Sequence, residues 1–254
     1  MLTDFELECT NCGKRHFANM TTLGCGDCDS TMNVAYRFAT DIGLDTTPLP
    51  FRDLNSWSLM SDRKTPVLHL QALGRQLSIM RLYAKLEFQT LTGSFKDRGS
   101  SVMMAAAAES GISNVVEDSS GNAGASVAAF AARTGINAHI FAPETAPKPK
   151  LMQISMYGAT VHTIPGTREQ TARAAIDFYK DQGFVYASHA LSPYFLEGTK
   201  TFAYEVMYQF NGTLPDHIVF PVGNGSLLLG AFKGLRELKD RGNIKSLPRL
   251  HCVQ

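Results

Sequence analysis

Short apolar runs alternate with longer amphipathic or alanine-rich segments from about residue 68 to the end of the chain. Runs rich in β-branched and aromatic residues indicate strands, whereas apolar positions spaced by three and four residues indicate helices. Strands are expected at residues 81–88, 114–117, 139–142, 160–164, 184–187, 217–222 and 250–253. Helices are expected at residues 100–109, 126–134, 147–157, 167–182, 193–210 and 231–240.

Strands and helices therefore alternate along most of the chain. Strands that are joined by crossover helices run parallel, and parallel sheets are normally covered by helices on both faces. The pattern predicts an α/β protein with doubly wound parallel sheets. Residues 38–66, which include Pro48, Pro50 and Pro66, lack this periodicity and are expected to form a loop-rich connector.

Composition narrows the class of protein further. The 254 residues include 24 Lys and Arg against 23 Asp and Glu, and 44% of the residues are hydrophobic. A globular chain with a sizeable core is expected, and its net charge of +1 gives no support for nucleic-acid or membrane-surface binding. No apolar run reaches the roughly 20 residues of a membrane span. The first residues, MLTDFELECT, do not resemble a secretory signal, so a cytoplasmic protein is expected.

Four of the five cysteines form two CxxC pairs near the N-terminus. Without a secretory signal, a disulfide framework is not expected. Paired CxxC motifs with glycines beside them are typical of a zinc site with four thiolate ligands, whereas a set of free thiols is the alternative. The candidate zinc ligands are Cys9, Cys12, Cys25 and Cys28.

Three junctions between a predicted strand and the following helix consist of small or flexible residues. They are residues 92–99 (TGSFKDRG), 119–124 (SSGNAG) and 223–227 (GNGSL). Open α/β sheets bind ligands beyond the carboxyl ends of their strands, where such junctions meet. The third junction suits a phosphate at a helix N-terminus, although an ordinary tight turn would have the same residues. It lacks the complete dinucleotide pattern, because Leu228 stands at the third glycine position.

Lys96 and Asn122 are the candidate reactive residues of the first two junctions. Lys96 lies at the start of a helix, where the helix dipole and partial burial lower the pKa of an amine and favour a Schiff base. A solvated surface lysine is the alternative. Asn122 lies in a loop with free N–H groups that could bind a carboxylate, and an Asx turn that caps the next helix is its alternative.

Taken in order, the three junctions resemble those of the fold-type-II, tryptophan synthase β-like, pyridoxal-phosphate enzymes, and among these the threonine synthases. The resemblance extends to KLEF (85–88), AAFAARTG (128–135), KLMQISMYGATV (150–161) and EGTKTFAYEV (197–206). The N-terminal CxxC pairs, which lead into NVAYR, are similar to the zinc-ribbon leader of many threonine synthases. The resemblance covers essentially the whole chain.

The resemblance implies specific roles for the residues of these junctions. Lys96 would bind pyridoxal phosphate as a Schiff base and later shuttle protons, and Asn122 would bind the 3′-oxygen of the cofactor. The cofactor phosphate would be bound by Gly223, Asn224, Gly225, Ser226 and Leu227. The α-carboxylate of an amino-acid substrate would be bound by Ser119, Ser120 and Ala123.

Threonine synthases convert O-phosphohomoserine and water to threonine and phosphate, and the resemblance implies this lyase reaction. The leaving phosphate needs cationic partners, and a charged surface is the alternative explanation of each candidate. The candidates are Arg98, Lys148, Lys150 and Lys200. Ser192 precedes Pro193 where threonine synthases commonly have asparagine, which leaves other fold-type-II reactions open. These are threonine or serine dehydration and the synthesis of cysteate or diaminopropionate.

The resemblance also implies a domain organisation. A zinc-ribbon-like segment is expected at residues 1–37, a smaller domain at residues 89–189, and a larger phosphate-binding domain at residues 38–88 and 190–254. Family members continue well beyond the phosphate loop, so the C-terminal part of the larger domain is expected to be missing. A homodimer is expected, and a truncated, non-catalytic relative that still binds the cofactor is the alternative to an enzyme. A nucleic-acid-binding ribbon has only Lys14, Arg15 and His16 in its favour.

Overall fold

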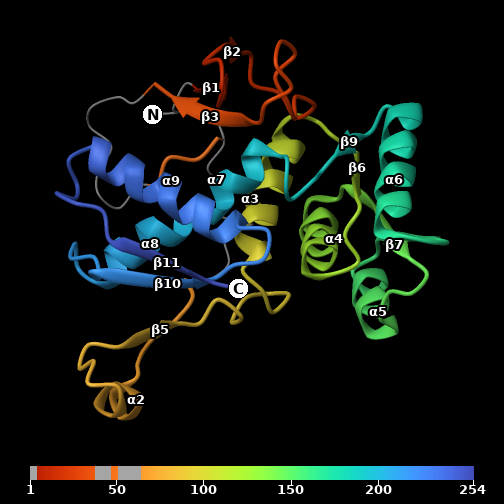
Figure 1. Ribbon diagram of the computed structural model, residues 1–254. Helices are drawn as coiled ribbons and strands as arrows, with labels where there is room; N and C mark the ends of the chain where they lie inside the picture. The colour runs from red at the N-terminus through yellow and green to blue at the C-terminus, as the bar shows by residue number, and fades with distance from the viewer. Residues whose placement is uncertain (1–4, 38–46, 51–63) are drawn as a thin grey trace.

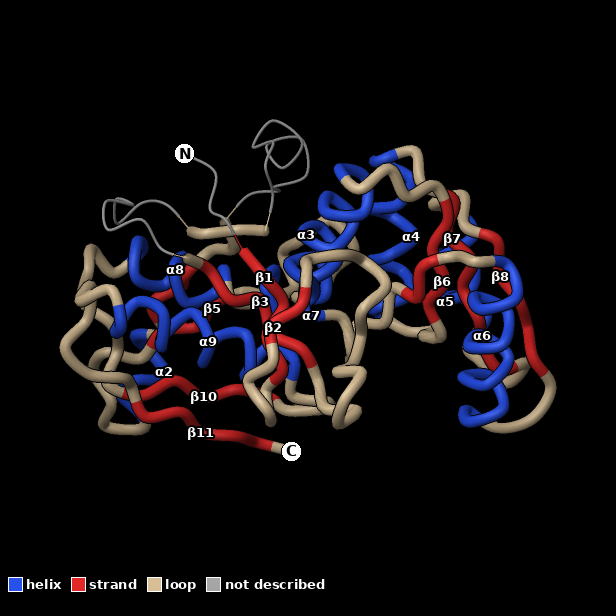
Figure 2. Tube along the Cα trace, turned by 90° about the horizontal axis from the view of Figure 1, so that it is seen from above, coloured by secondary structure: helices blue, strands red, loops and turns tan. Residues whose placement is uncertain are grey.

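A computed structural model describes residues 5–37, 47–50 and 64–254 of the chain. Most of the connector that the sequence predicts at residues 38–66 lies outside the described residues. The described part is an α/β structure in two halves, with a small antiparallel ribbon above one of them (Figures 1 and 2).

One half is built around a four-stranded parallel sheet in the order β8-β7-β6-β9. Its strands are β6 (Asn114–Glu117), β7 (Asn137–Pro143), β8 (Thr160–Ile164) and β9 (Val185–Tyr186). One face shares a core with α3 (Lys96–Glu109), α4 (Asn122–Thr134) and α5 (Lys148–Met156), and the other face packs against α6 (Arg168–Gln182). The sheet is therefore doubly wound, as the sequence predicts, and its strand order reverses between β6 and β9.

The other half contains a two-stranded parallel sheet of β10 (His217–Pro221) and β11 (Arg249–Val253). Helices α8 (Thr201–Gln209) and α9 (Ser226–Asp240) share a core with it, and α7 (Pro193–Thr199) packs against α9 and against α3 of the first half. An antiparallel pair, β4 (Val67–His69) and β5 (Tyr83–Lys85), carries the short helix α2 (Gln71–Gln76). This hairpin projects from the body at the lower left of Figure 1.

The N-terminal ribbon is a three-stranded antiparallel sheet in the order β2-β1-β3. Its strands are β1 (Phe5–Cys9), β2 (Arg15–His16) and β3 (Met32–Tyr36). Strand β3 packs against α7, so the ribbon lies over the half that contains α9 (Figure 1). Its own small core consists of Leu7, Met32, Val34 and two of the cysteines.

Most of the predicted strands are confirmed, whereas several helices begin earlier than predicted. Helix α3 begins at Lys96 instead of residue 100, and α9 begins at Ser226 instead of residue 231. Gly99 disfavours a helix in isolation, but a Cβ there would lie 2.4 Å from the ring of Phe195 on α7. Close packing of α3 and α7 therefore requires this glycine within the helix. The helix predicted at residues 193–210 consists of α7 and α8.

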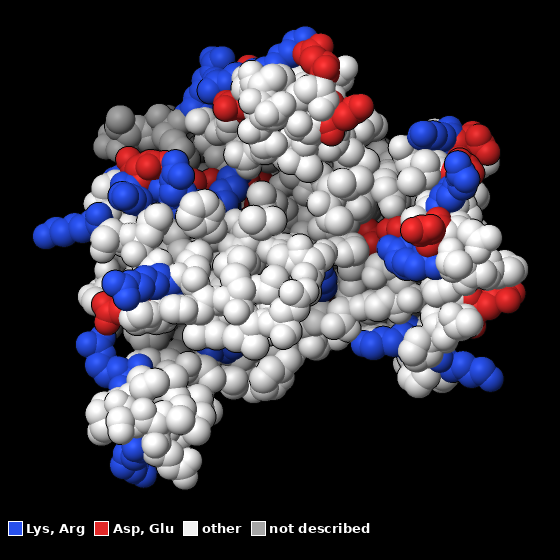
Figure 3. Space-filling view, viewed as in Figure 1, with Lys and Arg blue, Asp and Glu red and all other residues white. Residues whose placement is uncertain are grey.

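The surface carries mixed charge. On the face shown in Figure 3, basic and acidic side chains are interspersed near the edges, and the centre is largely uncharged. In the described ranges, no helix combines the length and the apolar character that a membrane crossing requires.

Candidate active site

The amine of Lys96 lies next to the glycine-rich loop that precedes α9. Lys96 is the first residue of α3, and its Nζ donates a hydrogen bond to Ser226 Oγ at 3.2 Å. The loop before it is closed by Asp97, whose Oδ2 accepts from the backbone N–H of Thr92 at 2.7 Å. The structure thus brings together two predicted site residues that are 130 positions apart in the sequence.

Burial makes this amine reactive at moderate pH. Only 9% of Lys96 is exposed, and the rings of Phe95 and Phe195 lie 4.9 and 5.4 Å from its Nζ. Burial lowers the pKa of Lys96 from 10.5 to about 8, although the negative charge of Glu117 opposes the shift. The alternative of a solvated surface lysine is therefore wrong. A neutral amine is the form that adds to an aldehyde.

The loop of residues 223–227 forms an open cradle at the N-terminus of α9. Gly225 has a φ of +84°, which a glycine adopts without strain, and it precedes the helix. A Cβ built on Gly223 or Gly225 would meet no atom within 4 Å. Asn224 Oδ1 accepts from both the N–H and the hydroxyl of Ser226. The first-turn N–H groups of a helix have no intrahelical acceptor, so the N–H of Leu227 is available to an anion that binds at this cradle.

The second loop follows β6 and leads into α4. Ser119 Oγ accepts from the N–H of Gly121 at 3.3 Å, and Asn122 is the first residue of α4. A Cβ on Gly124 would lie 1.8 Å from the carbonyl oxygen of Ser119, so the loop folds tightly over the helix start. Asn122 is exposed, and its Oδ1 accepts from Lys150 Nζ at 2.8 Å.

Ser119 and Ser120 are half-buried, whereas Ala123 is buried. Ala123 can therefore contribute a backbone N–H rather than its methyl group. Among the contacts that the described residues make, none joins this loop directly to Lys96 or to Ser226.

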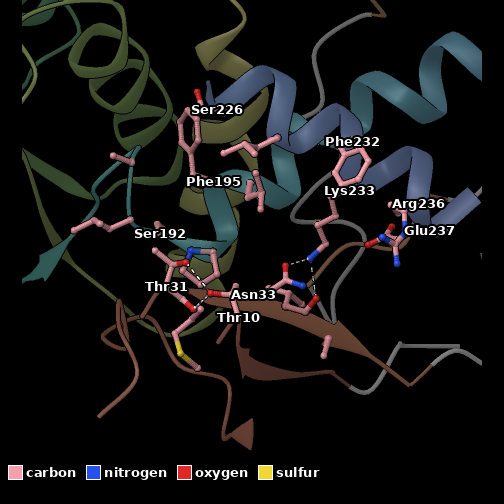
Figure 4. A pocket seen from close by; sticks show the side chains of 18 of the residues that line it. Thr10, Thr31, Asn33, Ser192, Phe195, Ser226, Phe232, Lys233, Arg236 and Glu237 are labelled. Atoms are coloured by element: carbon pink, nitrogen blue, oxygen red, sulfur yellow. Dashed lines mark hydrogen bonds between the residues drawn. The ribbon is translucent and has the colours of Figure 1, made fainter. Parts of the chain in front are cut away.

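A cavity of about 670 Å³ opens beside the glycine-rich loop. Ser226 and Phe195 line one end, and Phe232 and Lys233 line the side formed by α9 (Figure 4). The facing wall comes from the ribbon, including Asn33. The volume lies within the range of small-molecule sites in proteins.

Two of the four predicted phosphate partners are unavailable to a ligand. Arg98 is buried and forms ion pairs with Glu87 and Glu205, both at 2.7 Å. Lys200 is fully buried and pairs with Glu197 and, at 3.0 Å, with Glu237. The prediction that Arg98 and Lys200 bind the leaving phosphate is therefore wrong, and so is the alternative of a charged surface. Carboxylates inside the protein already pair with both side chains.

A buried carboxylate and a histidine belong to the same region, and no sequence motif pointed to them. Glu117 ends β6 and is fully buried, and its Oε1 lies 2.9 Å from Nδ1 of His189. Burial raises the pKa of Glu117, although the hydrogen bond from His189 opposes the shift. One sequence signal indicates Glu117: an acidic residue at the end of the apolar run NVVE is expected to point into the core or toward a ligand.

The four cysteines of the CxxC pairs form one cluster in the ribbon. Their sulfur atoms all lie within 4.8 Å of one another, with Cys9 and Cys28 at 3.4 Å and Cys12 and Cys25 at 3.7 Å. A tetrahedral zinc site with Zn–S bonds of about 2.3 Å has sulfur atoms about 3.8 Å apart. The arrangement can therefore hold a metal ion.

Comparison with characterised proteins supports the likeness to threonine synthases. The chain is 31% identical to a threonine synthase of Methanosarcina acetivorans and 30% identical to one of Methanocaldococcus jannaschii. The alignments cover 98% and 97% of this chain and 64% of each relative. The chain therefore spans less than two-thirds of the length of these relatives.

A solved structure and a family model identify the wider family to which the chain is similar. The structure of maize serine racemase superposes with a TM-score of 0.68 at 25% identity, covering 80% of this chain and 61% of that one. The family model described as "Pyridoxal-phosphate dependent enzyme" matches residues 59–254. With most of its residues matched, and with a buried amine beside a glycine-rich loop at a helix N-terminus, the chain belongs to the family of pyridoxal-phosphate dependent enzymes.

Proposed function

We propose that the chain binds pyridoxal phosphate at Lys96 and converts O-phosphohomoserine and water to threonine and phosphate. The observation that carries this proposal is the buried amine of Lys96, 3.2 Å from the Ser226 hydroxyl of an open glycine-rich cradle. The names of the relatives, which are threonine synthases, support the choice of substrate. Other fold-type-II eliminations, such as threonine or serine dehydration, are the alternatives that the substrate test must separate.

The residues of the three loops divide the work of binding. The N–H groups of Gly223, Asn224, Gly225 and Leu227 and the hydroxyl of Ser226 would hold the phosphate of the cofactor. Asn122 would bind the edge of its ring, and Ser119, Ser120 and Ala123 would bind the carboxylate of the substrate. When bound, the cofactor withdraws electrons from the α-carbon of the substrate.

Lys96 has two tasks in this proposal. Its neutral amine would hold the cofactor through the aldehyde, and as a free amine it would carry protons to and from the carbon atoms of the substrate. A pKa of about 8 for Lys96 suits both tasks, because near that pH a useful fraction of the side chain is neutral amine and a useful fraction is ammonium.

Lys150 is the phosphate partner that the contacts favour. It is the cation that donates to Asn122 Oδ1, and α5 begins with Lys148, two residues before it. A phosphate leaving group at this position would replace the amide oxygen as the acceptor of Lys150. Lys148 remains a second partner in the proposal.

Cofactor binding is tested by titrating the purified chain with pyridoxal phosphate and recording the visible absorption band. The band should form in the wild type, disappear in Lys96→Ala, and remain in Lys239→Ala, a matched change of an exposed lysine on α9. Borohydride reduction followed by intact mass measurement should give one stable adduct, located at Lys96. Equal spectra for wild type and Lys96→Ala would reject the proposal.

The substrate is tested separately with protein that carries the cofactor. Phosphate release from O-phosphohomoserine should exceed ammonia release from threonine or serine. The reverse result would assign a dehydratase. Cofactor binding without turnover of any of the three substrates would assign a non-catalytic binder.

We also propose that the ribbon cysteines bind one zinc ion as a structural site. The sulfur separations support four thiolate ligands, and the other described parts of the ribbon, such as the Leu7 and Val34 core, are small. Metal analysis should find about one zinc per wild-type chain and none in Cys12→Ser. A wild-type chain free of metal, or one that loses its thiols to disulfides under reducing purification, would contradict the site.

The remaining parts of the proposal concern the whole protein. The zinc-ribbon segment at 1–37, the smaller domain at 89–189 and the larger domain at 38–88 and 190–254 are the expected domains. A cytoplasmic homodimer that acts on an amino-acid substrate is expected. Sedimentation of the purified chain tests its oligomeric state.

A further inference from the structure

A buried carboxylate–imidazole pair lies where the strand order of the parallel sheet reverses. Glu117 is the last residue of β6, and His189 follows the neighbouring strand β9. Glu117 Oε1 lies 2.9 Å from His189 Nδ1, and Glu117 Oε2 accepts from the backbone N–H of His189 at 3.2 Å. Both carboxylate oxygens are therefore bound to one residue.

Burying the carboxylate of Glu117 carries a cost in folding free energy, which its contacts with His189 offset. Glu117 is fully buried, and a buried carboxylate is costly when its hydrogen bonds are incomplete. Within the described part of the chain, His189 donates both of the hydrogen bonds that Glu117 receives. The two contacts fix the backbone and the ring of His189 at once, which is more orientation than a simple packing role needs.

The position of the pair connects the two halves of the candidate active site. Glu117 comes directly before the loop that begins with Asp118 and Ser119, and its charge acts on the amine of Lys96. His189 lines the same cavity as Asn224 and Ser226, and its ring packs edge-on against Phe195 at 6.0 Å. The imidazole thus shares a cavity with the loop of residues 223–227, and its partner Glu117 directly precedes the loop that leads into α4.

The hydrogen bonds also determine which nitrogen serves the cavity. Because Nδ1 is bound to Glu117, it carries a proton, and Nε2 is the nitrogen left for a ligand. The side chain of His189 is 16% exposed, so a ligand in the cavity can reach it. A carboxylate that orients an imidazole in this way is a recurring acid–base arrangement in enzymes.

We propose that His189 is a catalytic acid–base residue that exchanges a proton with the substrate through Nε2, with Glu117 as its positioning residue. The inference rests on the proposed function and extends it. It adds that the leaving group of the substrate enters the cavity lined by His189, Asn224 and Ser226, next to the amine of Lys96, which hydrogen-bonds to Ser226. It assigns to His189 the protonation of the leaving oxygen and the deprotonation of the water that replaces it.

The step balances in protons and electrons. The amine of Lys96 takes a proton from carbon, and the C–H electron pair forms a carbon–carbon double bond. The adjacent C–O bond breaks with its pair on oxygen, and that oxygen takes the Nε2 proton of the imidazolium. When water adds, its oxygen bonds to carbon, one of its protons passes to Nε2, and the ammonium of Lys96 returns its proton to the other carbon.

The first test compares two substrates that differ only in the leaving group. His189→Gln should lower kcat for O-phosphohomoserine by about 100-fold, because general acid catalysis contributes at least that factor. For the γ-chloro analogue of the same amino acid, the loss of chloride should fall only several-fold, since chloride leaves without a proton. His217→Gln, a change of an exposed histidine on β10, should match the wild type with both substrates. Equal losses on both substrates, or no loss on either, would overturn the proposal.

The second test does not depend on turnover. NMR of ¹⁵N-histidine-labelled protein without cofactor tests the pair, and the resonances of His189 are those that vanish in His189→Gln. They should show a proton on Nδ1, and Glu117→Gln should change the chemical shift of that proton. Glu117→Gln keeps the shape of the side chain and should lower kcat at least about tenfold with the cofactor band intact. A His189 ring without a proton on Nδ1 would overturn the pair. A wild-type chain without a cofactor band would instead reject the proposed function.

Discussion

At the scale of single residues, the reactivity of the site depends on how deeply Lys96 is buried. Burial lowers the pKa of its amine to about 8, and the carboxylate of Glu117 prevents a larger shift. At pH 7 about one-tenth of such an amine is neutral, against roughly one in 3,000 for a pKa of 10.5. The folded chain thus increases the reactive form about 300-fold.

This difference predicts the pH dependence of cofactor binding. The rate at which pyridoxal phosphate links to the chain should rise about tenfold per pH unit below pH 8 and level off above it, because only the neutral amine reacts. Stopped-flow absorption between pH 6 and 10 measures the profile. A rate that keeps rising up to pH 10 would mean that Lys96 titrates like a solvated lysine.

Substitution by alanine should have different effects at Gly124 and at Gly223. Gly124→Ala should reduce the free energy of unfolding by about 1–3 kcal/mol, since its Cβ would overlap the carbonyl oxygen of Ser119. Gly223→Ala has space for its methyl group and an ordinary φ, so the fold should be unaffected. That methyl group enters the phosphate cradle, however, and cofactor affinity should fall at least about tenfold. Urea unfolding and absorption titration measure the two effects, and identical behaviour of the variants would contradict the assignment of the cradle.

Local patterns of small residues at helix starts singled out Lys96, Asn122 and the loop of residues 223–227 as candidates, and the structure brings Lys96 and Ser226 of that loop together. The sequence did not reveal the pair of Glu117 and His189. These residues are 72 positions apart, and only the pairing of β6 with β9 brings them together. The burial of Arg98 was missed for the same reason, since its partners come from other elements.

At the scale of elements, the start of α3 is fixed by a buried ion network. Arg98 donates to Glu87 in the loop before the helix and to Glu205 on α8, and Lys85 of β5 donates to Glu205 at 2.6 Å. Arg98 is two residues from Lys96, so the network positions the helix turn that carries the reactive amine. Charged side chains near Lys96 therefore serve to hold α3 rather than to bind a ligand.

Breaking this network should be costly. Arg98→Met should lower the free energy of unfolding by about 3–5 kcal/mol, because it leaves two buried carboxylates short of a partner. Arg15→Met removes ion pairs of the ribbon in which the arginine side chain is 52% exposed, and it should change stability little. Urea unfolding compares the two variants. A loss of under about 1 kcal/mol for Arg98→Met would show that the network contributes nothing net.

Helix boundaries show why elements were harder to predict than junctions. Apolar periodicity located α5 and α6 to within about one residue at each end, whereas α3, α4 and α9 begin about four or five residues before the predicted starts. The first turns of α3 contain Gly99 and polar residues, which disfavour a helix locally. Tertiary packing against Phe195 and the adjoining helices outweighs that local preference.

At the scale of the whole molecule, one lysine of α9 adds two hydrogen bonds to the packing of the ribbon strand β3 against α7. Lys233 Nζ donates to Asn33 Oδ1 and, at 2.8 Å, to the carbonyl oxygen of Val34 (Figure 4). It also pairs with Glu197 of α7, which accepts from the hydroxyl of Tyr36. The same helix begins at the phosphate cradle, so the cysteine cluster and the candidate active site share a structural support.

Removing this attachment should loosen the ribbon without unfolding the body. In Lys233→Met, the two bonds to β3 are lost, and each hydrogen bond to a charged group is worth about 1.5–3 kcal/mol. The ribbon should therefore open at least about tenfold more often, and limited proteolysis should cut it correspondingly faster. Lys239→Met, on the exposed side of the same helix, should be cut at the wild-type rate. If both variants are cut alike, the ribbon is held by its apolar contacts with α7, and Lys233 only neutralises Glu197.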